Sequence, residues 1–421
     1  MTALALHPLP HPLGAAERPG NVDLELAKQL AQPARTKIIL CVLDGLGGLA
    51  RHATLRSELE KAQIPNLDRL AARSEVGLTV PVGTGITPGS GPGHLALFGY
   101  DPLRFDIGRG VLEATGIDFE ITPTDVAARG NFCTLDSDGN ISDRRAGRVA
   151  TELSSKLVER LRQINLPGVE IFVEPVREHR FVLVLRGEGL GDAVSTTDPQ
   201  HEGVPPLPAR ALDEPSVVTA TLVNEFVRQA QGLLNDQVQA NGLMLRGFAK
   251  YPSLPQFPDV WGVRAAALAV YPMYRGLAKL AGMTAIPCPG GMTEQIHLIR
   301  QNWDNYDYFF VHYKKTDAAG EDGNFEAKCH ALEEFDSYVP ELLSLNADVL
   351  MIAGDHSTPA LMAAHSWHPV PFLLHSNYCR EGNAVHFNEQ ECVKGSLGII
   401  PAVDVMPLAM AHAMRFAKYG A

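Results

Sequence analysis

The chain has 421 residues, which is enough for two or three domains of ordinary size. Hydrophobic residues make up 45% and charged residues 20% of it, as in a globular protein. The net charge of −12, from acids spread along the chain, argues against a general role on nucleic acid or a membrane surface. The six cysteines form no C-x-x-C pair, and the first residues lack a basic segment. We therefore expect a cytoplasmic protein with reduced thiols.

The organisation of the chain follows from changes in composition and pattern. Residues 1–34, rich in Pro, His, Ala and Leu, predict a loosely attached extension with a short helix near 23–30. Beyond residue 117 the pattern becomes that of an antiparallel sheet with helices, which predicts a separate α+β domain over 118–250. This domain is inserted between residues 35–117 and 251–421, whose buried apolar runs predict a mostly parallel α/β core.

Apolar periodicity gives the individual elements. Strands are predicted over 37–43, 125–135, 170–173, 181–185, 308–311, 349–353 and 370–374. Helices are predicted over 64–70, 142–164, 217–234, 263–281 and 327–345.

Acids and histidines follow several of the predicted core strands. Asp44 follows the run Lys37–Leu43, and Asp355 with His356 follows Val349–Ala353. In an open α/β sheet, ligands bind outside the carboxyl ends of the strands. Carboxylate and imidazole groups bind divalent metals, although a single acid in a glycine turn is equally typical of a plain turn. The candidates of this kind are Asp44, Asp317, Glu321, Asp355, His356 and His365.

A serine between glycines precedes a predicted helix in the segment Thr87–His94. The glycines leave the hydroxyl of Ser90 uncovered, next to backbone N–H groups and the positive end of the helix. This setting suits a nucleophile that attacks phosphorus, and a nearby metal would make the hydroxyl easier to deprotonate. A flexible turn with a capping serine is the alternative.

Basic residues gather in the predicted inserted domain. Ser142 or Asp143 would cap the helix predicted over 142–164, with Arg144 and Arg148 on one face of its first turns. Cations at a helix N-terminus oppose its dipole, so an anion should compensate them. That anion is either a phosphate or carboxylate of a substrate, or a structural salt-bridge partner. The pair His179 and Arg180 lies at the turn between two predicted strands.

Taken together, five segments resemble the archaeal-type cofactor-independent phosphoglycerate mutases of the alkaline phosphatase superfamily. They are Asp44-Gly45, Thr87–His94, Asp143–Arg148, Gly354–Pro359 and His365–Pro371, in the order and spacing of the family. The similarity covers almost everything after residue 36. It implies an α/β protein with an alkaline-phosphatase-like three-layer core, a mostly parallel sheet and an inserted smaller α+β cap domain.

The resemblance also implies an activity and the residues that perform it. The reaction would interconvert 3-phosphoglycerate and 2-phosphoglycerate, as in glycolysis, through a phosphoserine at Ser90, with Lys314 on the transferring phosphoryl group. Two divalent metals are implied, Mn or Mg with Zn or Co as alternatives, and no 2,3-bisphosphoglycerate. One metal would bind Asp44, Ser90, Asp355 and His356, and the other Asp317, His365 and position 321. The implied substrate-binding residues are His94, Arg144, Arg148, His179, Arg180 and Arg246.

The sequence departs from the family at three places. Glu321 stands where a histidine ligand is usual, Lys315-Thr316 replaces Gly-Pro, and Gly93 replaces alanine, which we interpret as a small change. The glutamate is expected either to bind the same ion as Asp317 or to turn into solvent. Alternative functions are a metal-dependent phosphatase or phosphomutase of another phosphate ester, and a non-catalytic descendant with a decayed second metal site. The sequence does not define the oligomeric state.

Overall fold

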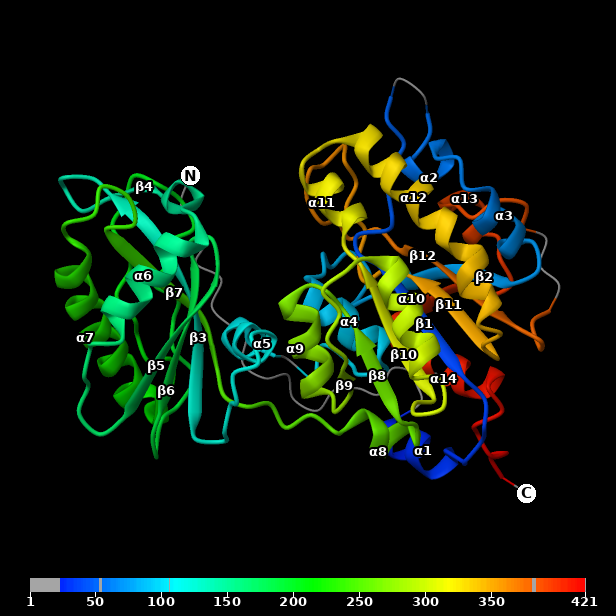
Figure 1. The fold of residues 1–421 in the computed structure, drawn as a ribbon, viewed down its shortest axis with the longest axis horizontal. Helices are drawn as coiled ribbons and strands as arrows, with labels where there is room; N and C mark the ends of the chain where they lie inside the picture. The colour runs from blue at the N-terminus through cyan, green and yellow to red at the C-terminus, as the bar shows by residue number, and fades with distance from the viewer. Residues whose placement is uncertain (1–22, 53–54, 106, 381–383, 421) are drawn as a thin grey trace.

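The computed structural model describes residues 23–52, 55–105, 107–380 and 384–420, and it contains two β-sheets with helix α5 (Arg109–Gly116) between them (Figure 1). The larger sheet has the strand order β13-β2-β12-β11-β1-β10-β8-β9. Of its described strands, β12 alone runs antiparallel to its neighbours. The strands are β1 (Ile38–Leu43), β2 (Glu75–Val80), β8 (Ala265–Leu268), β9 (Thr284–Ala285), β10 (Tyr308–Tyr313), β11 (Val349–Ala353), β12 (Val370–Ser376) and β13 (Gly398–Pro401).

Both faces of this sheet are covered, which explains why its central strands are apolar throughout. Ile38, Leu40 and Val42 of β1 face one hydrophobic cluster, and Ile39 and Cys41 face another. The first cluster takes side chains from α1 (Leu24–Leu30), α4 (Ser90–Leu97), α5, α8 (Phe257–Trp261), α9 (Pro272–Leu280) and α14 (Val405–His412). The second takes them from α2 (Glu58–Lys61), α3 (Pro65–Ala71), α10 (Met292–Gln301), α12 (Phe325–Ser344) and α13 (Glu389–Cys392).

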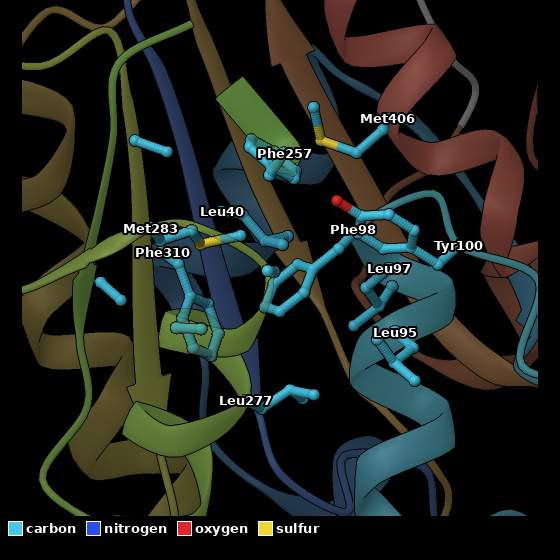
Figure 2. Close-up of a cluster of buried hydrophobic side chains, with 14 of the residues drawn as sticks. Leu40, Leu95, Leu97, Phe98, Tyr100, Phe257, Leu277, Met283, Phe310 and Met406 are labelled. Carbon is cyan, nitrogen blue, oxygen red and sulfur yellow. The ribbon is translucent and has the colours of Figure 1, made fainter. Parts of the chain in front are cut away.

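The first cluster joins segments that lie far apart in the chain. Leu40 of β1 and Phe310 of β10 pack with Phe98, the residue directly after α4, and with Phe257 of α8 and Met406 of α14 (Figure 2). The ring of Phe98 meets the ring of Phe310 edge to face, with 5.0 Å between centroids. This contact fixes α4, and with it the helix start at Ser90, against the sheet.

The smaller sheet is antiparallel and has the order β4-β3-β6-β5, with β7 paired to the other edge of β3. Helices α6 and α7 cover one face, where Val126, Ala128 and Phe132 of β3 are buried. The intervening residues Arg129 and Asn131 therefore point to the opposite face. Its elements are β3 (Asp125–Leu135), β4 (Ile141–Asp143), β5 (Glu170–Arg177), β6 (Arg180–Arg186), β7 (Gly242–Ala249), α6 (Thr151–Leu161) and α7 (Val217–Leu234).

The fold class predicted from sequence is confirmed: a three-layer α/β core with a mostly parallel sheet accompanies a smaller α+β unit. The predicted helix over 217–234 matches α7, and the strands predicted from apolar runs are all present. The domain limits at residues 118 and 250 stay predictions. Within the described ranges, the helices are too short or too polar to cross a bilayer.

The predicted extension over residues 1–34 is wrong for its described part. Helix α1 forms as expected, with the Asp23 side chain accepting from the Glu25 N–H. However, Ala27 is fully buried in the core, and Gln32 donates to the carbonyl oxygens of Met414 and Phe416. Apolar contact with α8 therefore attaches this segment to the core, while residues 1–22 lie outside the described residues.

Two predicted helices are wrong in their extent. The helix predicted over 142–164 begins only at Thr151, because Gly147 and Arg148 adopt left-handed conformations with φ of 64° and 51°. Asp143 accepts from the N–H groups of Arg145 and Gly147, and so it closes a turn instead of capping a helix. The helix predicted over 263–281 is strand β8 followed by α9, which starts at a proline as helices often do.

Candidate active site

Acids and histidines converge at one edge of the large sheet. Strands β1, β10 and β11 are parallel, so their carboxyl ends meet there. Asp44 directly follows β1, Asp355 lies just after β11, and Asp317 lies in α11 (Lys315–Glu321) after β10. Because β12 runs the other way, the loop that enters it brings His365 to the same edge. We call these residues, together with His356, the metal-ligand edge.

The predicted ligands form two groups that share His356. In the first group, one atom each of Asp44, Asp355 and His356 lies within 4.8 Å of the others. The second group consists of Asp317, His356 and His365 at the same spacing. The Oγ of Ser90, the first residue of α4, lies 3.1 Å from Nε2 of His356. The structure therefore brings the candidate nucleophile and five of the predicted ligands together.

The charges of the metal-ligand edge fit divalent cations. The residues Asp44, Asp317 and Asp355 are at most 1% exposed. The ammonium group of Lys314 bridges two of them, at 3.0 Å from Asp44 Oδ2 and 2.6 Å from Asp317 Oδ2. Asp44 Oδ1 and Asp355 Oδ2 remain buried without a hydrogen bond. Since a buried carboxylate oxygen without a hydrogen bond is costly, metal binding to these two oxygens would relieve an existing cost.

The pKa shifts reflect the same crowding of charge. Burial raises the pKa of Asp44, but Lys314 and His312 outweigh it and hold that pKa well below its usual value. Burial and the neighbouring Asp44 raise the pKa of Asp317. Burial opposes the charge of Lys314, yet Asp44 and Asp317 raise its pKa above the usual range. Lys314 therefore stays protonated beside the acids, as its implied role requires.

Glu321 lies at the rim of the second group. Its Oε1 and the Oδ1 of Asp317 are each 3.6 Å from Nε2 of His365. The Glu321 side chain is 55% exposed, unlike the buried carboxylates. Burial lowers the pKa of His365, but Glu321 and the carbonyl of Pro88 outweigh it and raise that pKa to about 9. Glu321 is thus placed to support the second group, directly or through His365.

His94 occupies a different place from the one its implied role requires. It is fully buried, with Nδ1 2.8 Å from the carbonyl oxygen of Ser90 and 3.2 Å from Asp355 Oδ2. This position does not fit contact with substrate, and it fits orientation of Asp355. Gly93 is also more than a small change, because a Cβ there would lie 2.1 Å from the carbonyl oxygen of Asp355.

Three residues that contact the metal-ligand edge were not predicted from the sequence. Tyr274 donates to Asp44 Oδ2, and His312 Nε2 lies 3.2 Å from the same oxygen. Thr358 donates to Asp317 Oδ1 at 2.6 Å, and its hydroxyl lies 2.9 Å from His356 Nδ1. His312 lies near the end of β10 and Thr358 next to the Asp-His pair, so their positions were a usable signal. Tyr274, on α9, gave none.

A cluster of arginines lies on the face of the small sheet that α6 and α7 leave uncovered. Arg129 of β3 is paired in register with Arg246 of β7, and Asn131 with Arg180 of β6. Burial and the neighbouring arginines Arg180 and Arg246 lower the pKa of Arg129 to about 10, although Glu113 opposes this. We call Arg129, Asn131, His179, Arg180 and Arg246 the cationic face.

Buried polar atoms of the cationic face have no hydrogen-bond partner. These are Arg129 Nε, Asn131 Oδ1, His179 Nδ1, Arg180 Nε and Arg246 Nε. Buried polar groups are normally paired, so several unpaired nitrogens on one face indicate a ligand. An anion with several oxygen acceptors fits this set best. The face includes the predicted His179, Arg180 and Arg246, and adds Arg129.

Arg144 and Arg148 do not lie together as predicted. Arg144 forms two-pronged hydrogen bonds with Asp198, the closest at 2.8 Å, so the structural salt-bridge alternative holds for it. Asp198 also approaches Arg246 at 3.7 Å, which leaves Arg144 beside the cationic face. Arg148 is exposed in the turn before α6, and the described contacts do not bring it to that face.

A tyrosine links the cationic face to the metal-ligand edge. Nη1 of Arg180 donates to the hydroxyl of Tyr271 at 3.1 Å. Nζ of Lys314 lies 5.8 Å from the centroid of the Tyr271 ring. The two regions of opposite charge therefore face one another across a single side chain, and one anionic molecule could contact both.

The α/β core, its metal-ligand edge and the accompanying cationic face define a protein whose carboxylates and histidines could hold divalent metals beside a site for an anion. The family model described as 2,3-bisphosphoglycerate-independent phosphoglycerate mutase matches residues 71–239. A relative from Thermotoga maritima, named as a probable enzyme of that kind, is 51% identical over 94% of this chain and 99% of its own length. One from Thermus thermophilus, with the same name, is 51% identical over 94% of this chain and 98% of its own length. The chain belongs to the family of 2,3-bisphosphoglycerate-independent phosphoglycerate mutases.

Two solved structures share the fold along nearly the whole chain. A protein of Pyrococcus horikoshii superposes with a TM-score of 0.80 at 28% identity, covering 92% of this chain and 99% of that one. A cofactor-independent phosphoglycerate mutase of Thermoplasma acidophilum superposes with a TM-score of 0.66 at 28% identity, covering 90% and 100%. The resemblance drawn from sequence motifs is confirmed.

Proposed function

We propose that this protein interconverts 3-phosphoglycerate and 2-phosphoglycerate by way of a phosphoserine at Ser90, without 2,3-bisphosphoglycerate. The observation that carries the proposal is the junction of the metal-ligand edge and the cationic face at Tyr271, in a member of this family. The substrate carries a phosphate and a carboxylate, so it offers one anionic group to the cationic face and another to the metal ions that the edge would hold.

The residues that would hold the metals are those of the two ligand groups. Asp44, Asp355 and His356, with Ser90, would hold one ion, and Asp317 and His365, with Glu321, the other. Bound divalent ions would lower the pKa of the serine hydroxyl and offset the charge of the transferring phosphoryl group. Oxygen-rich ligand sets favour Mn or Mg over Zn or Co.

In the first half-reaction, Ser90 Oγ forms a bond to phosphorus while the bond from phosphorus to the 3-oxygen of the glycerate breaks. The hydroxyl proton leaves the serine, and the glycerate oxygen takes up a proton. In the second half-reaction, the 2-hydroxyl of the retained glycerate loses its proton and forms a bond to phosphorus. The bond from phosphorus to Ser90 Oγ breaks, and Ser90 regains a proton. Lys314, protonated beside Asp44 and Asp317, would pair with the phosphoryl oxygens.

The cationic face would hold the glycerate between the two transfers. Arg129, Arg180 and Arg246 offer unpaired guanidinium nitrogens to its carboxylate. Retention matters because a glycerate that escaped would leave the phosphoserine to water, and the enzyme would act as a phosphatase. The six free thiols support a reducing, cytoplasmic setting.

The test is a coupled assay of purified protein with 3-phosphoglycerate and Mn²⁺, in the absence of 2,3-bisphosphoglycerate. The proposal predicts formation of 2-phosphoglycerate, lost on chelation and restored by Mn²⁺. Release of inorganic phosphate without 2-phosphoglycerate would instead identify a phosphatase. Bound metal with neither product would identify a non-catalytic descendant.

A further inference from the structure

A lysine is buried beneath the metal-ligand edge. Lys328 of α12 is 0% exposed. Its Nζ donates to three carbonyl oxygens, those of Gly45 at 2.8 Å, Gly47 at 2.9 Å and Thr358 at 2.8 Å. An ammonium group has three donors, so each one is used.

These carbonyls belong to the two loops that carry the ligands Asp44, Asp355 and His356. The N–H of Gly45 donates to Asp355 Oδ1 at 3.1 Å, so the first loop orients a ligand from the second. The hydroxyl of Thr358 contacts Asp317, a ligand of the second group, and His356, which both groups share. The loops are tightly opposed, because a Cβ at Gly45 would lie 2.5 Å from Thr358 Oγ1.

Two acids complete the support of the same loops. Glu58 is fully buried and accepts from the N–H of Ala360 at 2.7 Å and of Leu49 at 3.2 Å. Glu389 accepts from the N–H of Gly48 at 2.9 Å. Lys328 thus donates hydrogen bonds to the carbonyl groups of the loops, and the two acids accept hydrogen bonds from their N–H groups. Burying charged side chains that bind only to the main chain costs free energy. Such a cost is expected where the geometry of the loops serves a function.

We propose that Lys328 is a positioning residue of the metal centre, which sets the spacing of Asp44 relative to Asp355, His356 and Asp317. Its three donors are all used by the carbonyls, and it acts through them. This inference rests on the metal site of the proposed function.

Two effects of removing Lys328 have opposite signs. Loss of a positive charge next to the loops that carry the carboxylate ligands would tighten metal binding. Loss of the three hydrogen bonds would let the loops separate and weaken it. Supporting contacts around metal ligands typically matter by about 10- to 100-fold in affinity, so we expect the loss of geometry to dominate.

The experiment titrates Mn²⁺ into the metal-free full chain, wild type against Lys328→Met, by calorimetry. The proposal predicts Mn²⁺ binding weakened about 10- to 100-fold. It also predicts a fall in kcat at saturating Mn²⁺, with the KM for phosphoglycerate nearly unchanged. Lys328→Gln, which keeps two donor hydrogens, should lie between. If neither variant folds, Glu58→Gln replaces them, since it loosens the same loops.

Arg415→Met is the matched control. Arg415 is also buried, at 1% exposure, and donates to the carbonyls of Ala34 and Thr36 before β1, at the end opposite to Asp44. Its loss should lower the melting temperature and leave Mn²⁺ affinity unchanged. Lys328→Met binding Mn²⁺ as tightly as wild type, or more tightly, overturns the inference alone. A wild type that binds no Mn²⁺ overturns the proposed function.

Discussion

The metal-ligand edge is negative and largely bonded within itself, whereas the cationic face is positive and leaves five buried polar atoms unpaired. The edge is built at the ends of strands: Asp44 and the pair Asp355 and His356 come just after β1 and β11, Asp317 lies in the helix after β10, and His365 lies in the loop that enters β12. The face is built from side chains on neighbouring antiparallel strands, with Arg129, Asn131 and Arg246 within β3 and β7, and His179 and Arg180 at the start of β6. The comparison indicates that the edge is arranged to bind cations next to the reacting serine, and that the face is arranged to bind an anion.

Removing the nucleophile should give the largest loss of activity, and it should affect only the chemistry at the metal-ligand edge. Ser90→Ala is expected to lower kcat by several orders of magnitude, because no covalent intermediate can form. The melting temperature and Mn²⁺ binding through the remaining ligands should change little. A variant that retained more than a few per cent of the wild-type rate would disprove the phosphoserine route.

Removing one cation of the face should give the next largest effect. Arg180→Ala is expected to lower kcat/KM by about 10- to 1000-fold, the worth of one or two charged hydrogen bonds. Arg186→Ala is the control, because Arg186 lies on the same strand and is paired with Asp125 at 2.7 Å. It should leave the kinetics unchanged. Equal kinetic losses in both variants would show that the face acts only through stability.

Arg144 tests whether an arginine beside the cationic face acts on substrate or only forms a structural ion pair. Because Arg144 is bonded to Asp198, Arg144→Ala should lower the melting temperature and lower kcat/KM less than Arg180→Ala does. Thermal melts and steady-state kinetics on the two variants check this ranking. A loss in kcat/KM as large as that of Arg180→Ala, with an unchanged melting temperature, would return Arg144 to the substrate site.

Substitution of Glu321, at the rim of the metal-ligand edge, should change which metal the second ligand group prefers. A carboxylate at position 321 exchanges an imidazole nitrogen for a hard oxygen, so the wild type should favour Mn²⁺ or Mg²⁺. In Glu321→His the preference should move toward Zn²⁺ or Co²⁺. Metal titrations on both proteins measure the number of bound ions. A second ion that binds only to the histidine variant would show that Glu321 is not a ligand.

The last of these predictions concerns pH and the cationic face, and its effect on stability vanishes at neutral pH. Burial and the neighbouring Arg180 and Arg129 lower the pKa of His179 from 6.5 to about 4. Between these values the unfolded chain takes up a proton that the folded protein refuses, so stability falls as pH drops through this window. The loss should reach about 3 kcal/mol near pH 4 and vanish above pH 7. Urea unfolding of wild type and His179→Gln should show a shallower slope in the variant; identical slopes would contradict the burial of a neutral imidazole.

The sequence was informative where a functional residue comes directly after a predicted strand. Asp44 and Asp355 could be found because an apolar run ends just before each, and helix 217–234 because its apolar period is regular. Arg129 could have been found from the same principle. In β3 the alternate residues Val126, Ala128 and Phe132 are apolar, which leaves Arg129 on the opposite face.

Other features depend on contacts that no local pattern carries. The helix over 142–164 was overextended because left-handed turns at Gly147 and Arg148 depend on the bonds of Asp143. The alanine-rich run of β8 is equally typical of a helix, and its pairing with β10 decides the matter. A lysine in a predicted surface helix, such as Lys328 in the helix over 327–345, is usually exposed to solvent. Only the meeting of two distant loops makes it a buried cation.

The most direct test of the account is capture of the phosphorylated enzyme. Wild-type protein with Mn²⁺ is mixed with 3-phosphoglycerate, quenched in acid within milliseconds, digested and analysed by mass spectrometry. The account predicts one phosphate on Ser90, appearing before 2-phosphoglycerate accumulates and absent after chelation. Steady formation of 2-phosphoglycerate with no phosphate on Ser90 at any time, or with phosphate on another residue, would contradict it.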